Sequence, residues 1–181
     1  MTPRRLLDAS MLLALAIGVA ACSSQGSGTN PGDSVVIAGT SHVVWKSAGD
    51  GFGPVLPAGA PCHREVTYDL DVSGSLAWNI CQFAAGADFN DPTAYSTVAG
   101  SRTLTAAERA QANAAASAIK VSSVTSCGAD LDSRTLEVDG TSGTITYGDD
   151  FYACNKLYER YVLTAPLSNL GILLNGMAHN P

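Results

Sequence analysis

Positive charge is scarce in this chain, which has 10 Lys and Arg residues against 16 Asp and Glu and a formal net charge of −6. The few basic residues do not form the clusters that hold phosphate backbones or anionic lipid headgroups. We therefore expect no nucleic-acid partner and no electrostatic attraction to a lipid surface.

The sequence also lacks the motifs of the common hydrolases and nucleotide-binding proteins. It contains no G-x-S-x-G, no H-E-x-x-H and no G-x-x-x-x-G-K-[ST]. A zinc site is disfavoured because there is no C-x-x-C, and the neighbours Cys62 and His63 cannot easily bind one ion together. We predict a non-enzymatic protein with no cofactor and no metal.

Histidine is rare, and the three that occur suggest no catalytic triad. His42 is expected on an outward strand position, His63 beside a disulfide and His179 in the C-terminal segment. Carboxylates in 88–91 and 148–150 have the oxygen ligands that calcium prefers, but neither segment completes a calcium-loop pattern. We interpret these acids as turn formers on the solvated surface.

Long hydrophobic runs are missing too. The most apolar stretch, Met11–Ile17, is much shorter than the roughly 20 residues of a membrane-spanning helix. It follows Arg4 and Arg5 and leads to small residues before Cys22, which is the organisation of an export signal.

The residues Val19-Ala20-Ala21-Cys22 resemble the lipobox of bacterial lipoprotein precursors. The resemblance implies a signal peptide over 1–21, lipidation of Cys22 and attachment to a membrane through acyl chains. Ser23 implies the outer membrane if the cell has two membranes. The alternative is an ordinary secretory peptide. Cleavage would remove two positive charges and one negative charge, which changes the net charge from −6 to −7.

The remaining chain divides into a tether and one domain. Residues 22–34 include a Gly- and Ser-rich stretch that behaves as a flexible coil. Residues 35–181 have the length of a single domain. An exported domain with an even number of further cysteines is expected to form disulfides, here two among Cys62, Cys81, Cys127 and Cys154, for which three connectivities exist.

Hairpin geometry favours one of these connectivities. Opposing Leu136 to Ile145 puts the apolar residues of two strands on one face and leaves 139–142 as the loop. The same register would bring Cys127 opposite Cys154. Cys62 is then paired with Cys81 by elimination, with one of them beyond the regular ladder or next to a bulge.

The remaining pattern predicts an α+β fold, with an antiparallel sheet of hairpins and two helices packed on one face. Strands are expected over 35–45 and 95–98, and a hairpin turns at Ser73-Gly74 between an alternating run from Val66 and another ending at Ile80. Ala84 to Asp91 is expected to be a loop.

Two segments have the features of helices. Thr105 and Glu108 have the spacing of a capping box, and the helix should reach about Ile119. A second helix should begin at Thr164 and carry a buried stripe. The expected contacts of the first helix are Leu104, Ala107, Ala114, Ala118 and Ile119. The expected stripe of the second is Leu167, Leu170, Leu173, Leu174 and Met177.

The order of several short motifs resembles the emfourin-type family of small bacterial inhibitors of thermolysin-type metalloproteases. These motifs are Asp50–Gly53, Leu104–Glu108, Ala129-Asp130 and Ala165–Leu167. The resemblance implies a protease as partner, but it transfers no inhibitory residue. The anchor and the four further cysteines depart from the family.

Three functional hypotheses follow. The first is a lipid-anchored envelope lipoprotein with a binding or structural role, the second a surface-tethered protease inhibitor, and the third an enzyme of unrecognised type. Aromatic residues after the acidic pair offer a candidate binding surface, but we favour the alternative that they cover the end of the sheet beside Cys154. They are Phe151, Tyr152, Tyr158 and Tyr161.

Overall fold

A single sheet organises the part of the chain that can be described. The computed structural model describes residues 30–35, 40–48, 56–71, 73–123, 133–140, 143–151 and 158–179. In these residues the strands are β1 (Thr40–Ala48), β2 (Glu65–Asp71), β3 (Ser75–Phe83), β4 (Tyr95–Thr103), β5 (Ser133–Gly140), β6 (Gly143–Asp149) and β7 (Arg160–Val162). The helices are α1 (Ala106–Ser117) and α2 (Thr164–His179), with a 3-10 turn at Pro92–Ala94.

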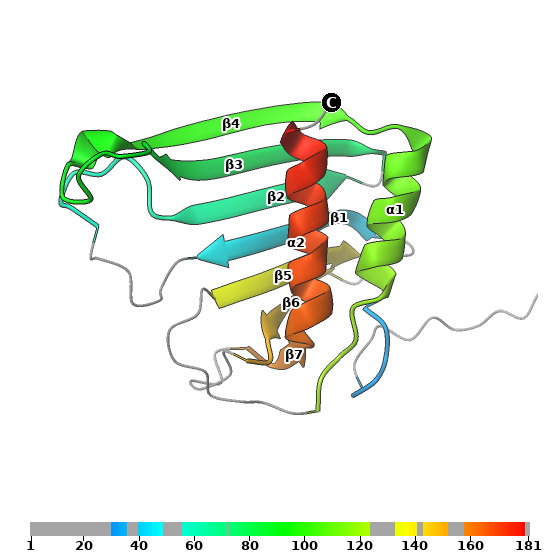
Figure 1. Ribbon diagram of the computed structural model, residues 1–181. Helices are drawn as coiled ribbons and strands as arrows, with labels where there is room; N and C mark the ends of the chain where they lie inside the picture. The colour runs from blue at the N-terminus through cyan, green and yellow to red at the C-terminus, as the bar shows by residue number, and fades with distance from the viewer. Residues whose placement is uncertain are drawn as a thin grey trace, which may run out of the picture.

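The strand order is β4-β3-β2-β1-β5-β6-β7, so β1 lies in the centre and the two hairpins extend the sheet on either side of it. Neighbouring strands are antiparallel except for β6 and β7, which are parallel. Both helices lie on the same side of the sheet, with α2 crossing its centre (Figure 1). The α+β prediction is therefore confirmed, and the parallel β7 is the one departure from an antiparallel sheet. None of the described helices is long and apolar enough to cross a membrane.

The first hairpin forms around the predicted turn. Tyr68 pairs with Trp78 and Leu70 with Leu76, so the apolar sets of β2 and β3 share the helix-covered face. Gly74 occupies the turn with φ of +97°, a backbone conformation that residues with a Cβ rarely adopt. The alternation of side chains and the glycine in the turn were together sufficient to predict this hairpin.

The second hairpin has a different register from the prediction. Ile145 pairs with Val138 rather than with Leu136, which pairs with Tyr147. Gly140 pairs with Gly143, so two residues separate the strands instead of the four expected. A shift of two residues keeps the same side chains on the same face, so the apolar pattern could not distinguish the two registers.

Two other strands differ in their bounds. The first strand covers Thr40–Ala48 rather than 35–45, and Val43 and Trp45 point inward as expected. The strand from Tyr95 continues to Thr103, well beyond the predicted 95–98, because it pairs along all of β3. Its Gly- and Ser-containing second half has little strand propensity of its own, so tertiary pairing decides its length.

Helix α1 begins with the predicted capping box. The Thr105 hydroxyl accepts from the Glu108 backbone N–H, and the Glu108 carboxylate accepts from the Thr105 backbone N–H. The predicted contact face is partly wrong: Leu104 and Ile119 are buried, but the helix buries Ala112 and Ala116. An Ala-rich helix has too little contrast between its sides for the sequence to indicate which one is buried. The three predicted contacts that are exposed are Ala107, Ala114 and Ala118.

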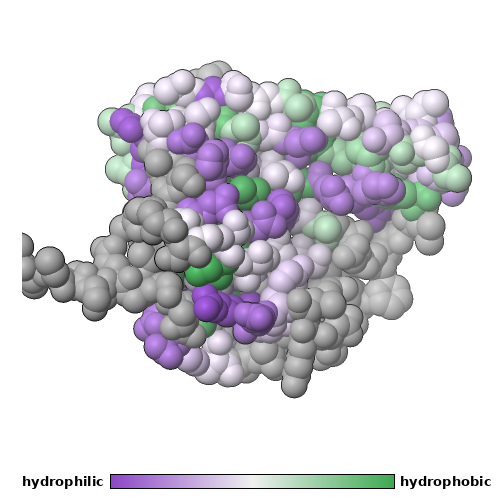
Figure 2. Space-filling model, turned by 180° about the vertical axis from the view of Figure 1, so that it is seen from behind, coloured by the Kyte–Doolittle hydropathy of each residue, from purple (hydrophilic) through white to green (hydrophobic). Residues whose placement is uncertain are grey.

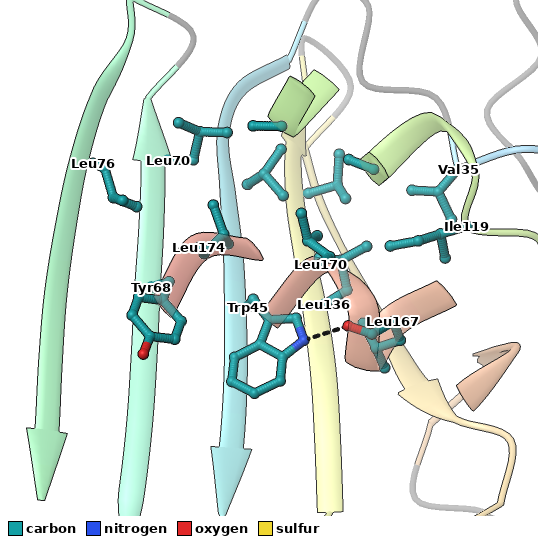
Figure 3. Packing of buried hydrophobic residues seen from close by; sticks show 14 of the residues in the cluster. Val35, Trp45, Tyr68, Leu70, Leu76, Ile119, Leu136, Leu167, Leu170 and Leu174 are labelled. Atoms are coloured by element: carbon teal, nitrogen blue, oxygen red, sulfur yellow. Dashed lines mark hydrogen bonds between the residues drawn. The ribbon is translucent and has the colours of Figure 1, made fainter. Parts of the chain in front are cut away.

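Helix α2 carries most of the core on its side of the sheet. It buries Leu167, Leu170, Leu174 and Met177 as predicted, and Leu173 packs against the cluster from its border. Figure 3 shows Leu167, Leu170 and Leu174 around Trp45 of β1, whose indole N–H donates a 2.9 Å hydrogen bond to the Leu167 carbonyl. The other labelled side chains of this core are Val35, Tyr68, Leu70, Leu76, Ile119 and Leu136.

The disulfide between Cys62 and Cys81 is present, with the two Cα atoms 5.6 Å apart. Cys81 lies in β3, whereas Cys62 precedes β2 and lies beyond the ladder, which is one of the two arrangements considered from the sequence. Cys127 and Cys154 lie outside the described residues. The second disulfide therefore stays a prediction, and the register that suggested it is not the one observed.

Candidate functional site

One face of the sheet is covered by no described helix or strand. Viewed from that side, hydrophilic side chains gather over much of the described surface (Figure 2). They come from the outward positions of β2, β1, β5 and β6, which form rows that follow the pairing and also include Val44 and Gly148. One row is Thr67, Lys46, Thr135 and Gly148; the next is Asp69, Val44, Glu137 and Thr146; a third is Asp71, His42, Asp139 and Thr144. We call this surface the open face.

A groove of about 370 Å³ hollows the open face at the end of β1. Its floor is formed by hydroxyl-bearing side chains and by an ion pair in which the Lys46 ammonium lies 2.8 Å from a Glu137 carboxylate oxygen. Both side chains of the pair keep substantial solvent exposure, so solvent screens their attraction. The lining residues are Lys46, Ser47, Ala48, Glu65, Thr67, Ser133, Thr135, Glu137, Thr146 and Tyr158.

Tyr158 owes its place in this groove to a glycine. A Cβ at Gly148 would lie only 2.4 Å from Tyr158 Cδ2, so the bare backbone of β6 lets the tyrosine ring lie against the sheet. Tyr161 packs edge-on against the same ring, with the centroids 6.2 Å apart. These contacts hold a partly exposed aromatic ring beside the hydroxyl groups of the floor.

A second hollow of about 360 Å³ adjoins the first and shares Thr146 and Tyr158 with it. It runs beside the part of β6 that precedes Tyr147, where pairing with β7 begins. Glu159 and Arg160 line its outer side. The two hollows therefore form one extended depression, the β6 groove, with Tyr158 and Thr146 at its middle.

His42 lies at the other end of the open face among carboxylates. Its Nδ1 is 3.0 Å from an Asp69 carboxylate oxygen, and its Nε2 is 3.9 Å from one of Asp71. The hydrogen bond with Asp69 raises the pKa of His42 above 6.5; desolvation lowers it in part, and the charges of Asp69, Asp71 and Asp139 raise it further. Each partner of the Asp69 pair is about two-fifths exposed, at 42% for Asp69 and 40% for His42.

This histidine–carboxylate pair is the described feature that comes nearest to an acid–base catalyst. A catalytic base is held within reach of a bound substrate, in a pocket that limits water. The His42–Asp69 pair instead lies on an open surface and lines none of the described grooves. The enzyme hypothesis therefore gains no support from it.

The acidic pair before Phe151 was interpreted as solvated surface, which is wrong for Asp149. This side chain is buried, and one of its carboxylate oxygens lies 3.3 Å from an Arg134 guanidinium nitrogen. The other accepts from the Thr164 hydroxyl and from the Phe151 backbone N–H. Asp150 accepts from the Thr164 backbone N–H at 3.0 Å. The two carboxylates thus cap the start of α2, where negative charge is favoured, and their role is structural.

An aromatic corner forms at the end of β3. Phe89, about half exposed, stacks on Phe83 with the ring centroids 4.5 Å apart, and the Tyr95 hydroxyl donates to the Phe89 carbonyl at 3.2 Å. Arg64 and the Cys62–Cys81 disulfide adjoin the same corner. A loop held in this way presents a phenyl ring at small entropic cost.

The remaining predicted site residues fall into two groups. Cys22, Cys127, Cys154 and Tyr152 lie outside the described residues. His63 is exposed, and His179 is the last residue of α2, with its ring 6.2 Å from that of Trp78. In the described part of the chain no three His, Cys, Asp or Glu side chains are grouped to hold a metal ion.

Sequence reasoning missed the groove because its walls come from segments far apart in the chain. Lys46 and Glu137 are 91 residues apart and meet only through the β1–β5 pairing. The alternation of polar residues on β2 and β5 indicated an outward face, but nothing in the sequence indicated which strands would be neighbours.

No protein-family model, no curated protein and no solved structure matches this chain. The resemblances to lipoprotein precursors and to the emfourin-type family therefore depend on the sequence motifs alone.

Proposed function

We propose that this protein is a lipid-anchored lipoprotein of the bacterial cell envelope that acts by binding, through the open face of its sheet. The open face is the observation that carries the proposal. No helix or strand in the described part of the chain covers the side of the sheet opposite the helices, and that side is hollowed and lined with donors and acceptors.

The N-terminal sequence supports the anchor. The resemblance to a lipobox at Val19–Cys22 places an acylated Cys22 a short distance before Asn30, the first described residue. From there the chain is tied to the domain: the Gly32 backbone N–H donates to the Val121 carbonyl, and Val35 donates to Ile119. Val121 in turn bridges to Val162 of β7. The tether therefore meets the domain at the β7 edge.

The position of this attachment favours binding away from the membrane. β7 and β4 are the opposite edges of the sheet, so the strands that carry the open face extend from the tethered edge outward. In a cell with two membranes, Ser23 favours the outer membrane as the site of attachment.

Photo-crosslinking in cells tests the proposal. A benzophenone amino acid in place of Thr144, on the exposed part of β6, should give a crosslinked product that carries protein or glycan. The same amino acid in place of Ile172, which is exposed on α2, serves as the control on the helix side. Products of equal yield from both positions, or from neither, would count against a binding role for the open face.

The aromatic corner favours a second candidate function, a surface-tethered protease inhibitor. An inhibitor presents an exposed side chain on a loop that does not collapse, and Phe89 is held by Phe83, Tyr95 and the neighbouring disulfide. Stoichiometric inhibition of a thermolysin-type protease that is lost in Phe89→Ala would support this function. Full protease activity in the presence of excess protein would exclude it for that class.

A further inference from the structure

We infer that the β6 groove binds a neutral saccharide chain, with its sugar hydroxyls on the Thr, Lys and Glu side chains of the floor and a sugar ring against Tyr158. This inference rests on the proposed function and specifies the ligand class of the open face. It depends on the chemistry of the lining rather than on the size of the groove alone.

The floor suits a ligand whose groups both donate and accept hydrogen bonds. Thr67, Thr135 and Thr146 offer hydroxyls that can do either, while Lys46 only donates and an ionised Glu137 only accepts. Thr67 and Thr135 flank Lys46 on the two neighbouring strands, so three polar groups lie side by side across the sheet. Adjacent sugar hydroxyls can meet such a row, because each of them is both a donor and an acceptor.

The charges disfavour other ligand classes. Among the described lining residues of the β6 groove, an anion would meet three carboxylates, of Glu65, Glu137 and Glu159, against the two cationic groups of Lys46 and Arg160. A cation would have to compete with Lys46 for Glu137, since the two are already paired at 2.8 Å. Among the described lining residues, an apolar ligand would find Ala48, Ile145 and the Tyr158 ring interspersed with hydroxyl and charged groups. A neutral polar ligand is the class that remains.

Tyr158 supplies the apolar part of the site. A sugar ring has a face of C–H groups that packs on an aromatic ring, and an amphipathic tyrosine combines such a surface with a hydroxyl. The ring lies between the two hollows and is fixed by Gly148 and Tyr161, so it needs little ordering when a ligand binds. Glu159 and Arg160 line the hollow beyond the ring, so a saccharide chain that extends past Tyr158 would contact them as well.

The test uses the full mature chain in detergent micelles and, as probes, soluble neutral oligosaccharides of three to six sugars from glucan, mannan, galactan and arabinan. Saturation-transfer NMR detects binding, and titration calorimetry measures affinity.

Thr135→Val removes one hydroxyl with little change in shape and should weaken binding about three- to tenfold. Tyr158→Ala should weaken it at least as much. Thr97→Val, on the same sheet face but in β4 and outside the groove, should leave affinity unchanged.

The inference would be overturned if no oligosaccharide binds, or if Thr135→Val and Tyr158→Ala bind sugars with the affinity of the wild type. It would also be overturned if extended peptides compete for the groove more strongly than sugars. The last outcome would mean that a peptide strand pairs with β6 before Tyr147, where none of the described strands pairs with its outer side. Crosslinking from position 144 distinguishes these failures from failure of the proposed function, because a protein partner captured there would leave the binding role intact.

Discussion

Trp45 and Gly171 are in direct contact across the centre of the molecule: a Cβ at Gly171 would lie 2.3 Å from Cζ2 of the indole. The glycine brings α2 close enough to β1 for the Trp45 N–H to reach the Leu167 carbonyl at 2.9 Å. A glycine inside a helix normally weakens it, so here the close approach offsets the lower helix propensity.

We predict that Gly171→Ala destabilises the protein by about 1 to 3 kcal/mol, although alanine is the better helix former, because the methyl group overpacks the indole. Gly176→Ala is the matched control in the same helix, since nothing lies within 4 Å of its would-be Cβ. It should be neutral or stabilise by up to about 1 kcal/mol. Urea unfolding of both variants measures the difference, and equal stabilities would show that the contact is not tight.

Removing the observed disulfide should cost about 3 kcal/mol, because it closes a loop between residues 19 apart in sequence and thereby restricts the unfolded chain. The double substitution Cys62→Ser with Cys81→Ser isolates this bridge from any other. Its unfolding midpoint in urea should fall well below that of the wild type. An unchanged midpoint would indicate that the bridge does not restrict the unfolded state in solution.

The pKa of His42 should lie above 6.5 in the folded protein, because the hydrogen bond with Asp69 favours the protonated ring. A raised pKa contributes stability that is fully present below pH 6.5 and is lost as pH rises through the folded value. NMR titration of the imidazole protons measures the pKa, and Asp69→Asn should lower it. Asp88→Asn, in the loop after β3, is the control and should leave the pKa of His42 unchanged. An equal drop of this pKa in both variants would contradict the assignment of the shift to Asp69.

Thr105→Ala should destabilise the protein by about 1 kcal/mol, since it removes the hydroxyl that caps the first turn of α1. Asn113→Ala, at an exposed position of the same helix, should instead be neutral or slightly stabilising because alanine has the higher helix propensity. The thermal unfolding midpoint should therefore fall in Thr105→Ala and stay unchanged or rise slightly in Asn113→Ala. A Thr105→Ala variant as stable as the wild type would mean that water replaces the cap at no cost.

The features that the sequence predicted correctly depend on neighbours in the chain. The hairpin around Gly74, the capping box at Thr105 and the apolar stripe of α2 follow from spacing and from side-chain preference. The features it missed depend on distant pairing. His42 meets Asp69 because β1 pairs with β2, and Asp149 is buried because it lies under the start of α2.

The register of β5 and β6 is the most instructive error, because a two-residue shift leaves the buried faces identical. The length of the turn decides between the two registers. Gly140 pairs with Gly143, so a two-residue connection joins the strands. The positions of these glycines favour such a short turn, but the predicted register follows the apolar pattern instead.

The lipid anchor at Cys22 is central to the proposed function, and the intact mass of the membrane-extracted protein tests it directly. We predict a chain that begins at Cys22, carries the added mass of acyl groups and gains four hydrogens on reduction, two for each disulfide. Cys22→Ala should release the protein from the membrane fraction. An unacylated chain, or one that begins at another residue, would contradict the proposal of a lipid-anchored envelope protein.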